Sequence, residues 1–443
     1  MQSPESIELR PVVPRADVAY RRFIIAALVL AVAAGFLLAI HVPLSRLMDA
    51  GRPERTADLV QAHGQVQLLG FAGLYVIGMS LRLLPRFAGA RLQMEALVPV
   101  VLWLMVVSLV TRAAVLPWFY GDAHDALLIL SVFGVLIAAA CFLLLVAATL
   151  GTDARHVDAS GIAFLLGALS LFAANLVATF AAVDAVAAGD RFIPYAANAA
   201  VTQLQLLGFL LVFITGVGLR ALPLLVGRQQ PERGAAILPA AIVALVSVHA
   251  ASLLYLAYVS PGRSVSMLAD ASLALLGLCL LLFVWQAGIL RPRANRTRPA
   301  SQSALWLVRG AFFWLTVAGC LMVYFGGAAF ADRQLFSQSE LDAVRHVLGA
   351  GVITNLVLGM SLLILPEFAA ERQQANRQRL LALSLAVLVN LAALLRVGPS
   401  VATDALSYDD RNLSMAIAGS LAETALLVFA VYFVRLLWRT RVS

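Results

Sequence analysis

The sequence predicts an all-α integral membrane protein with twelve transmembrane helices, arranged as three quasi-repeats of four. Composition, the length of the apolar segments and a motif that occurs three times predict this class. Of the 443 residues, 62% are hydrophobic and 13% are charged, whereas soluble domains are about a quarter charged. A bilayer offers the backbone no water, so only helices or closed barrels span it. The apolar segments reach about 20 residues or more, which favours helices over the roughly 10-residue strands of a barrel.

Twelve apolar segments are long enough to cross a bilayer as helices. The first is longer than the apolar region of a signal peptide, so we interpret it as a transmembrane helix. We expect the twelve helices at approximately residues 20–45, 62–86, 94–118, 124–149, 159–184, 198–224, 235–259, 267–290, 303–329, 343–367, 379–400 and 412–437. They are expected to form a single transmembrane domain over residues 1–443, with repeats at approximately 20–150, 159–290 and 303–437.

A motif of two glycines and a proline marks the second helix of each group. Residues 70–89 read GFAGLYVIGMSLRLLPRFAG, residues 208–227 read GFLLVFITGVGLRALPLLVG and residues 351–370 read GVITNLVLGMSLLILPEFAA. In each copy the glycines are eight residues apart, and the proline follows seven residues after the second glycine. The copies lie 138 and then 143 residues apart. A period of this length predicts a repeated multi-helix unit rather than a solenoid repeat.

The arginines predict how the chain is oriented in a bacterial inner membrane. With both termini in the cytoplasm, 22 of the 32 arginines fall on the cytoplasmic side, and the chain contains no lysine. This distribution follows the positive-inside rule. Its strongest signal is the run Arg291, Arg293, Arg296 and Arg298. We therefore interpret the net charge of +8 as membrane orientation. The sequence has no basic stripe interleaved with aromatic residues, so nucleic-acid binding is not predicted.

Histidines are the main candidates for ligand chemistry. Under this topology five of the six lie toward the outer side, namely His41, His63, His124, His249 and His346. We interpret His41, His124 and the cytoplasmic His156 as interfacial side chains. For His249, inside a predicted span, a ligand role and a hydrogen bond to a neighbouring helix both stay open. His63 and His346 belong to the repeated segment, which favours a ligand role for both.

His63 and His346 occupy different positions of the repeat. His63 is seven residues before the first glycine of its copy and His346 is five, a difference of about 200° around a helix. Two helices can still present them to one cofactor from different sides, as axial imidazoles do for haem. We predict a haem b site formed by His63, His346, Arg345 and Gln65, with Arg345 pairing a propionate. His249 is the next candidate metal ligand. Gln65, Gln67 and the segment around Arg345 are expected to bond the second ring nitrogens.

The segment HGQVQLLGFAGLYVIGMSLRLLPRF at residues 63–87 resembles the NnrS-type membrane proteins linked to the nitric-oxide response. That family begins its repeated helices with the pattern H-x-H-x-x-x-x-G. His63 and Gly70 match the first histidine and the glycine, while Gln65 replaces the second histidine. In the third copy His346 matches the second histidine and Val344 replaces the first. The resemblance implies haem, and also copper, near the outer side.

The second copy, with Val201 and Gln203, has neither histidine, so part of the copper ligand set implied by the resemblance is missing. Twelve helices in three groups of four also resemble the catalytic subunit of haem–copper oxidases. Those proteins carry a His–Tyr pair in helix 6 and two histidines in each of helices 7 and 10. Here helix 6 has no histidine, and helices 7 and 10 have only His249 and His346. A complete oxidase centre is therefore not expected.

Three functions remain open. The first is a haem-binding inner-membrane protein, with or without copper, associated with the nitric oxide response or respiratory redox chemistry. The second is a transporter or channel for a small solute, since repeats are common in transporters. The third is a cofactor-free scaffold or assembly subunit. Both catalytic and purely binding roles are compatible with the first. The lipid bilayer is the expected partner, and a homo-oligomer or a respiratory-chain partner fits the same features.

The arginine distribution generates a test of topology. A reporter that is active only in the periplasm, fused after Ser443, should be inactive because the C-terminus is expected in the cytoplasm. The same reporter inserted between the first two predicted helices should be active. Activity of the C-terminal fusion would reverse the side assigned to every histidine.

Overall fold

A computed structural model describes residues 15–48, 53–152, 158–225, 237–260, 262–291, 299–332, 337–368, 375–402 and 405–442. Within these ranges twelve helical segments are long and apolar enough to cross a membrane, and none of the described residues forms a strand. This result confirms the predicted class. His156, Arg293, Arg296 and Arg298 lie outside the described residues.

The described chain consists of helices joined by short connections. The first four spans comprise α1 (Arg15–Leu30), η1 (Ala31–Phe36), α2 (Leu37–Leu47), α3 (Pro53–Gln65), η2 (Val66–Gly73), α4 (Leu74–Ala88), α5 (Leu97–Val110), η3 (Thr111–Val115), η4 (Leu116–Trp118) and α6 (Asp122–Gly151). The next four comprise α7 (Ala159–Ala188), α8 (Tyr195–Gln203), η6 (Leu204–Leu211), α9 (Val212–Leu225), α10 (Ile237–Tyr258) and α11 (Arg263–Ala287). The last four comprise α12 (Pro299–Asp332), α13 (Gln338–His346), η7 (Val347–Thr354), α14 (Asn355–Phe368), α15 (Ala375–Val401) and α16 (Tyr408–Val442).

The three spans that carry the repeated motif have the same internal change of helix type. Each begins as an α-helix, widens into an eight-residue π-helical segment and returns to an α-helix. The π segments η2, η6 and η7 begin at Val66, Leu204 and Val347, so they repeat with the same 138- and 143-residue offsets as the motif. Local helix geometry thus follows the sequence repeat in register. A three-fold rotation relating the groups of four stays a prediction.

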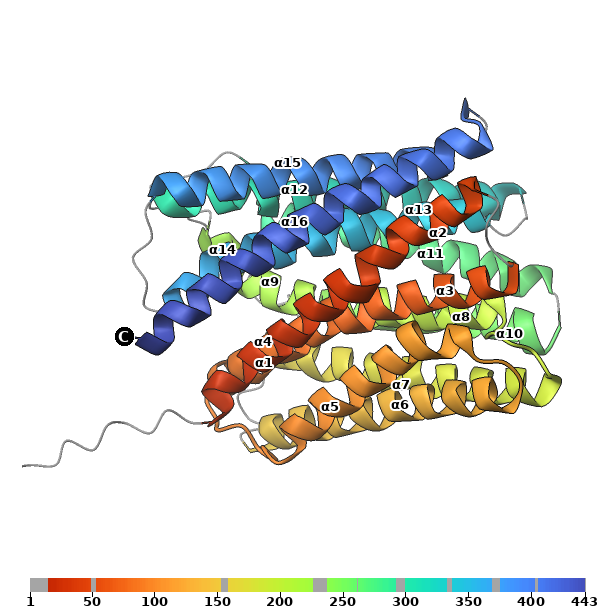
Figure 1. The fold of residues 1–443 in the computed structure, drawn as a ribbon, viewed down its shortest axis with the longest axis horizontal. Helices are drawn as coiled ribbons and strands as arrows, with labels where there is room; N and C mark the ends of the chain where they lie inside the picture. Colours follow the sequence, from red (N-terminus) through yellow and green to blue (C-terminus); the bar gives the residue numbers. More distant parts are fainter. Residues whose placement is uncertain are drawn as a thin grey trace, which may run out of the picture.

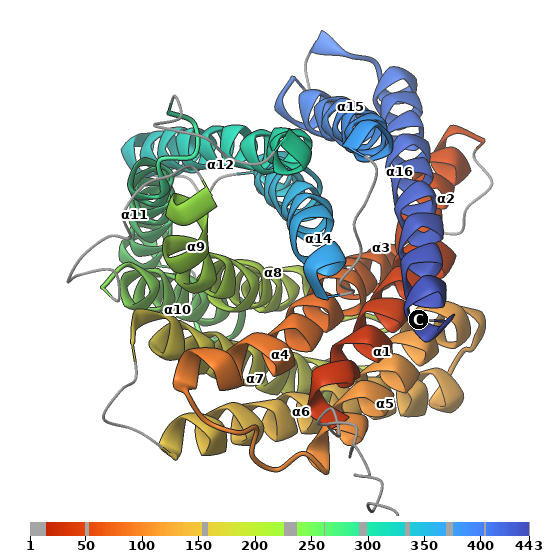
Figure 2. The same cartoon turned by 90° about the vertical axis from the view of Figure 1, so that its left-hand side faces the viewer.

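The motif-bearing spans lie at the middle of the bundle. Their apolar windows are 78%, 78% and 72% buried, against 39–56% for the other nine candidate spans of the described chain. Figure 2 shows α4, α9 and α14 near the centre, with α6, α11, α12, α15 and α16 on the outside. The start of α1 and the C-terminus lie at the same end of the bundle (Figure 1), as an even number of spans requires.

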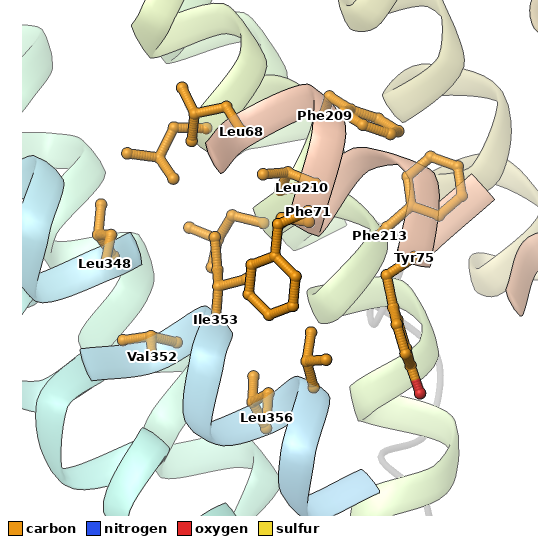
Figure 3. Close-up of a cluster of buried hydrophobic side chains, with 14 of the residues drawn as sticks. Leu68, Phe71, Tyr75, Phe209, Leu210, Phe213, Leu348, Val352, Ile353 and Leu356 are labelled. Atoms are coloured by element: carbon orange, nitrogen blue, oxygen red, sulfur yellow. The ribbon is translucent and has the colours of Figure 1, made fainter. Parts of the chain in front are cut away.

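The π segments meet in an apolar cluster. η2 packs against both η6 and η7, and Figure 3 shows Phe71 of η2 close to Leu210 of η6 and Ile353 of η7. Phe71, Leu210 and Ile353 are at most 3% exposed. Because π turns are rare and are frequently found at functional sites, three of them packed together make this region a candidate for function.

Glycines let some helices approach closely enough for backbone contact. On α12, a Cβ added to Gly326 would lie 2.7 Å from the backbone oxygen of Asp270 on α11 and 2.8 Å from the backbone nitrogen of Ala274. Backbone atoms of two packed helices cannot yield as a side chain can. The next residue, Gly327, is exposed, and a Cβ there would meet no atom within 4 Å. Small residues at such contacts are typical of membrane helix packing.

These adjacent glycines provide a matched test of packing. Gly326→Leu should destabilise the folded protein by about 3 kcal/mol, because added atoms in a close-packed interface force the backbones apart. Gly327→Leu adds the same atoms on the open face and should leave stability nearly unchanged. Thermal unfolding of the purified protein in detergent measures both. Equal melting temperatures for the two variants would contradict the observed α11–α12 contact.

Candidate functional site

Two histidines from different ends of the sequence lie next to each other in the structure. His63 is near the end of α3, and His346 is the last residue of α13, directly before η7. Their ring centroids are 6.4 Å apart and their ring planes differ by only 7°. Both rings are partly buried. The structure therefore brings together the two histidines that the sequence singled out.

The hydrogen bonds of these rings determine which nitrogen carries the proton. Nδ1 of His63 is 2.9 Å from the backbone oxygen of Gly35, and Nδ1 of His346 is 2.9 Å from the backbone oxygen of Asp342. A carbonyl oxygen only accepts, so each Nδ1 carries hydrogen and donates it. In the neutral ring Nε2 then keeps its lone pair. Metal-binding histidines commonly have this arrangement, in which one nitrogen is tied to a carbonyl and the other is available for a ligand bond.

The acceptors differ in part from those expected from the sequence. Gln65, Gln67 and the segment around Arg345 were expected to bond the second ring nitrogens. This is wrong for the two glutamines, whereas Asp342 lies in that segment, three residues before Arg345. The acceptors are Gly35 in η1 and Asp342, one turn before His346. The Gln65 side chain instead exchanges amide contacts of 3.2 and 3.4 Å with Gln205 of η6. Gln65 therefore joins two motif-bearing helices while also lining the cavity described next.

Both histidines line a cavity of about 350 Å³. Helices α2, α3, α13, α15 and α16 contribute to its wall, together with η1, η2, η7 and residues of the sixth span. Gln65 and Arg345 line it too, so four of the five predicted site residues share one cavity. Two wall positions are glycines with open space in front of them, because a Cβ on Gly64 or Gly349 would meet nothing within 4 Å.

The charged residues of the cavity wall are three arginines and one aspartate, Arg46, Arg345, Arg396 and Asp342. The wall thus has a formal excess of two positive charges when the histidines are neutral. The guanidinium of Arg345 is of special interest, because its buried Nε and Nη2 make no hydrogen bond to any described residue. A buried donor without a partner is costly, so this group is suited to an acceptor that a ligand brings.

Asp342 connects His346 to α15. Its Oδ1 lies 3.1 Å from Nδ1 of His346. Its Oδ2 accepts hydrogen bonds from Nη2 of Arg396 at 2.8 Å and from the hydroxyl of Ser400 at 3.0 Å. Nη1 of Arg396 also donates to the Ser400 hydroxyl at 3.0 Å. The carboxylate is therefore held from two sides while it faces the imidazole.

His249 lies away from this cavity. It is fully buried in α10, and its Nδ1 bonds the backbone oxygen of Ala269 on α11 at 2.9 Å. The Ser272 hydroxyl is 3.3 Å from the same nitrogen. His249 is not among the residues that line the cavity of His63 and His346. The structure thus shows the helix–helix hydrogen bond that was one of its two interpretations.

Sequence reasoning missed several residues of this region. Arg396 could have been noticed, since an arginine inside a membrane span is by default a functional candidate. Asp342 could have been noticed by its i,i+4 spacing to His346 on one helix face. Gly35 carries no such signal, because it contributes only a backbone carbonyl from the first span.

The interfacial interpretation is wrong for His124. This residue is only 1% exposed. Its Nδ1 lies 3.1 Å from Oδ1 of Asp125, and its Nε2 lies 3.8 Å from Oδ2 of Asp58 on α3. Arg191 donates to the same Asp58 oxygen at 2.5 Å. A buried ion cluster therefore anchors α3 one to two turns before His63.

Comparison with known proteins agrees with the resemblance seen in the sequence. The family described as "NnrS protein" matches residues 15–441, nearly the whole chain. The chain therefore belongs to the NnrS family and is a multi-span membrane protein. Among curated proteins, no significant match to the sequence is found.

The contact between Asp342 and Arg396 predicts a measurable coupling. Either Asp342→Asn or Arg396→Gln should destabilise the protein, because each leaves its partner unpaired among helices. The double variant should lose less stability than the sum of the two single variants' losses, with a coupling of about 1 kcal/mol for this partly exposed pair. Unfolding of the wild type, the two single variants and the double variant in mixed detergent gives the double-mutant cycle. Strictly additive losses would mean that the pair does not form.

Proposed function

We propose that this NnrS-family protein binds a haem b group between His63 and His346 and acts in the nitric oxide response or in respiratory redox chemistry of the bacterial inner membrane. The observation that carries the proposal is the pair of imidazoles on different helices, each with Nδ1 tied to a carbonyl. Haem iron takes two axial ligands of this kind from opposing elements. No complete oxidase centre is needed for this role.

The ring separation supports one ion between the two histidines. Two nitrogens each about 2 Å from one ion and in line with it are about 4 Å apart, and about 1.2 Å from each nitrogen to its ring centre gives roughly 6.4 Å between centroids. The observed value is 6.4 Å, with nearly parallel rings.

The charge of the wall supports a dianionic ligand. Haem b carries two propionates, and the cavity wall has a formal excess of two positive charges. Arg345 is placed to pair one propionate, since two of its buried guanidinium nitrogens make no hydrogen bond to the described residues. Charge-assisted bonds of this kind are among the stronger hydrogen bonds in proteins. The second propionate falls to Arg46, which also lines the wall, because Arg396 is already bonded to Asp342 and Ser400.

The shape of the wall supports a flat ligand. Gly64 follows His63 directly, and Gly349 lies one turn after His346, and both present open space where other residues carry a side chain. A planar ring needs such side-chain-free surface beside its axial ligands. The apolar side of the cavity comes from residues such as Phe36, Val42 and Phe71, which exclude water from the ring edge.

When bound, the haem would supply one-electron redox chemistry and a binding site for diatomic molecules. The chain's own residues do the rest. His63 and His346 would hold the metal, Gly35 and Asp342 fix their tautomers, and the apolar wall would keep water away. We derive no role for copper. No group of three or more His, Cys, Asp or Glu side chains in the described part of the chain is placed to hold a metal.

Absorption spectroscopy of the purified protein tests the proposal. The wild type should show a Soret band with about one haem per chain, and the double variant His63→Ala/His346→Ala should lose it, because both proposed iron ligands are gone. Gly349→Leu should lower haem content at least fivefold by filling the cavity. Gly327→Leu, the same substitution on an open face, should not. A folded wild type grown with sufficient haem but lacking a Soret band would leave the transporter or scaffold interpretations.

A further inference from the structure

We propose that the two histidines are unequal: His346 is the permanent ligand, and His63 is the exchangeable one. A small neutral donor, such as a diatomic gas, would then reach the metal on the His63 side. This inference rests on the proposed haem site, and it concerns which side of that site admits a ligand. The structure supports it through the different restraints on the two rings.

His346 is held by its own helix. Its Nδ1 faces two acceptors of one residue, the backbone oxygen of Asp342 at 2.9 Å and the Oδ1 of the same residue at 3.1 Å. Residues four apart on an α-helix lie one above the other on the same face. The acceptors therefore move with the ring, and the bond persists whatever neighbouring helices do.

The Asp342 carboxylate is itself immobilised. Arg396 and Ser400 of α15 donate to Oδ2 at 2.8 and 3.0 Å, which leaves Oδ1 directed to the imidazole. A chain of bonds thus runs from α15 through Asp342 to His346. Rotating the His346 ring away from the cavity would break its contacts to both the backbone oxygen and Oδ1 of Asp342.

His63 has a single restraint, from another helix. Its Nδ1 bonds only the backbone oxygen of Gly35 at 2.9 Å among the described residues. Gly35 belongs to η1, a π-helical turn of the first span. The side chain of Gln67 covers Gly35, since a Cβ there would be 3.0 Å from the Gln67 amide. The His63 ring is therefore held by one hydrogen bond, whereas Nδ1 of His346 faces two acceptors.

The open space beside the two rings does not distinguish the two ligands. Gly64 beside His63 and Gly349 beyond His346 both face open space. The two rings differ in the number of contacts that hold Nδ1 and in the chemical group that accepts from it. A carboxylate makes a metal-bound imidazole a stronger donor than a carbonyl does. The metal–His346 bond is thus expected to be the stronger, and an incoming donor displaces the weaker His63.

The exchange is balanced without any co-reactant. Nε2 of His63 would give up its bond to the metal as the incoming neutral donor takes that position. With carbon monoxide as the donor, no oxidation state or protonation state would change, because both ligands are neutral two-electron donors and Nδ1 of His63 keeps the hydrogen that it donates to the Gly35 oxygen. The released ring can return when the donor dissociates, so the Gly35 bond acts as a tether.

Matched alanine variants test the inequality, with carbon monoxide as the probe on the reduced, full-length protein. His63→Ala should keep haem within twofold of the wild type and bind carbon monoxide at least tenfold faster, because the competing ligand is gone. Added imidazole should restore the wild-type spectrum. His346→Ala should retain less than a tenth of the haem, because the anchoring ligand is lost.

Asp342→Asn keeps both histidines and tests the cause of the inequality, even if His346→Ala fails to fold. It should lower haem retention during dilution at least threefold. Glu340→Gln removes a charge from the same helix while preserving a residue that suits the capping box of Ser337, and should change nothing. Equal or reversed behaviour of the two alanine variants, or equal effects of Asp342→Asn and Glu340→Gln, would overturn the inference while leaving the haem site intact. A wild type without haem would overturn the proposed function itself.

Discussion

The bilayer gives a polar side chain no hydrogen-bonding solvent, and the arrangement of this protein follows from that constraint. Polar groups in a span must find partners inside the bundle or line a cavity. Accordingly, the three spans that carry His63, Gln203, Gln205 and His346 are the most buried of the twelve candidates. The remaining helices surround them and present apolar side chains outward. The site thus lies where the fold already had to gather its polar residues.

Within those central spans, the π turns decide what the polar residues face. A π segment inserts extra residues into a turn and so rotates everything after it relative to a regular helix. Each of the three segments begins directly after the same repeat position, held by Gln65, Gln203 and His346. The polar position therefore always ends an α-helix, and the mainly apolar π segment that follows contributes to the central cluster of Figure 3. Phe71 of η2 and Ile353 of η7 belong to this cluster and also line the cavity, so the π segments connect the two regions.

Much of the fold could be predicted from the sequence, because hydropathy and repeat spacing report directly on membrane crossing. The second span shows the limit: it begins at Arg55 rather than near residue 62, since the polar first turns of α3 extend the helix beyond the apolar segment. The pairing of His63 with His346 was predictable from the repeat. The role of the Gly35 carbonyl was not predictable, because every residue has a carbonyl. The burial of His124 was missed because a position at the end of a helix does not show which side chains pack over it.

The same repeat explains how two non-equivalent positions meet in one cavity. Positions seven and five residues before the first glycine point about 200° apart on a helix. The first motif-bearing span has a histidine at one of them, the third has a histidine at the other, and the second has none. His63 therefore directs its Nδ1 away from α3, to the first span, whereas His346 directs its Nδ1 back along α13. Two identical side chains thus acquire different partners from register alone. The proposed inequality of the ligands combines these different partners with the bonds by which Arg396 and Ser400 hold the Asp342 carboxylate.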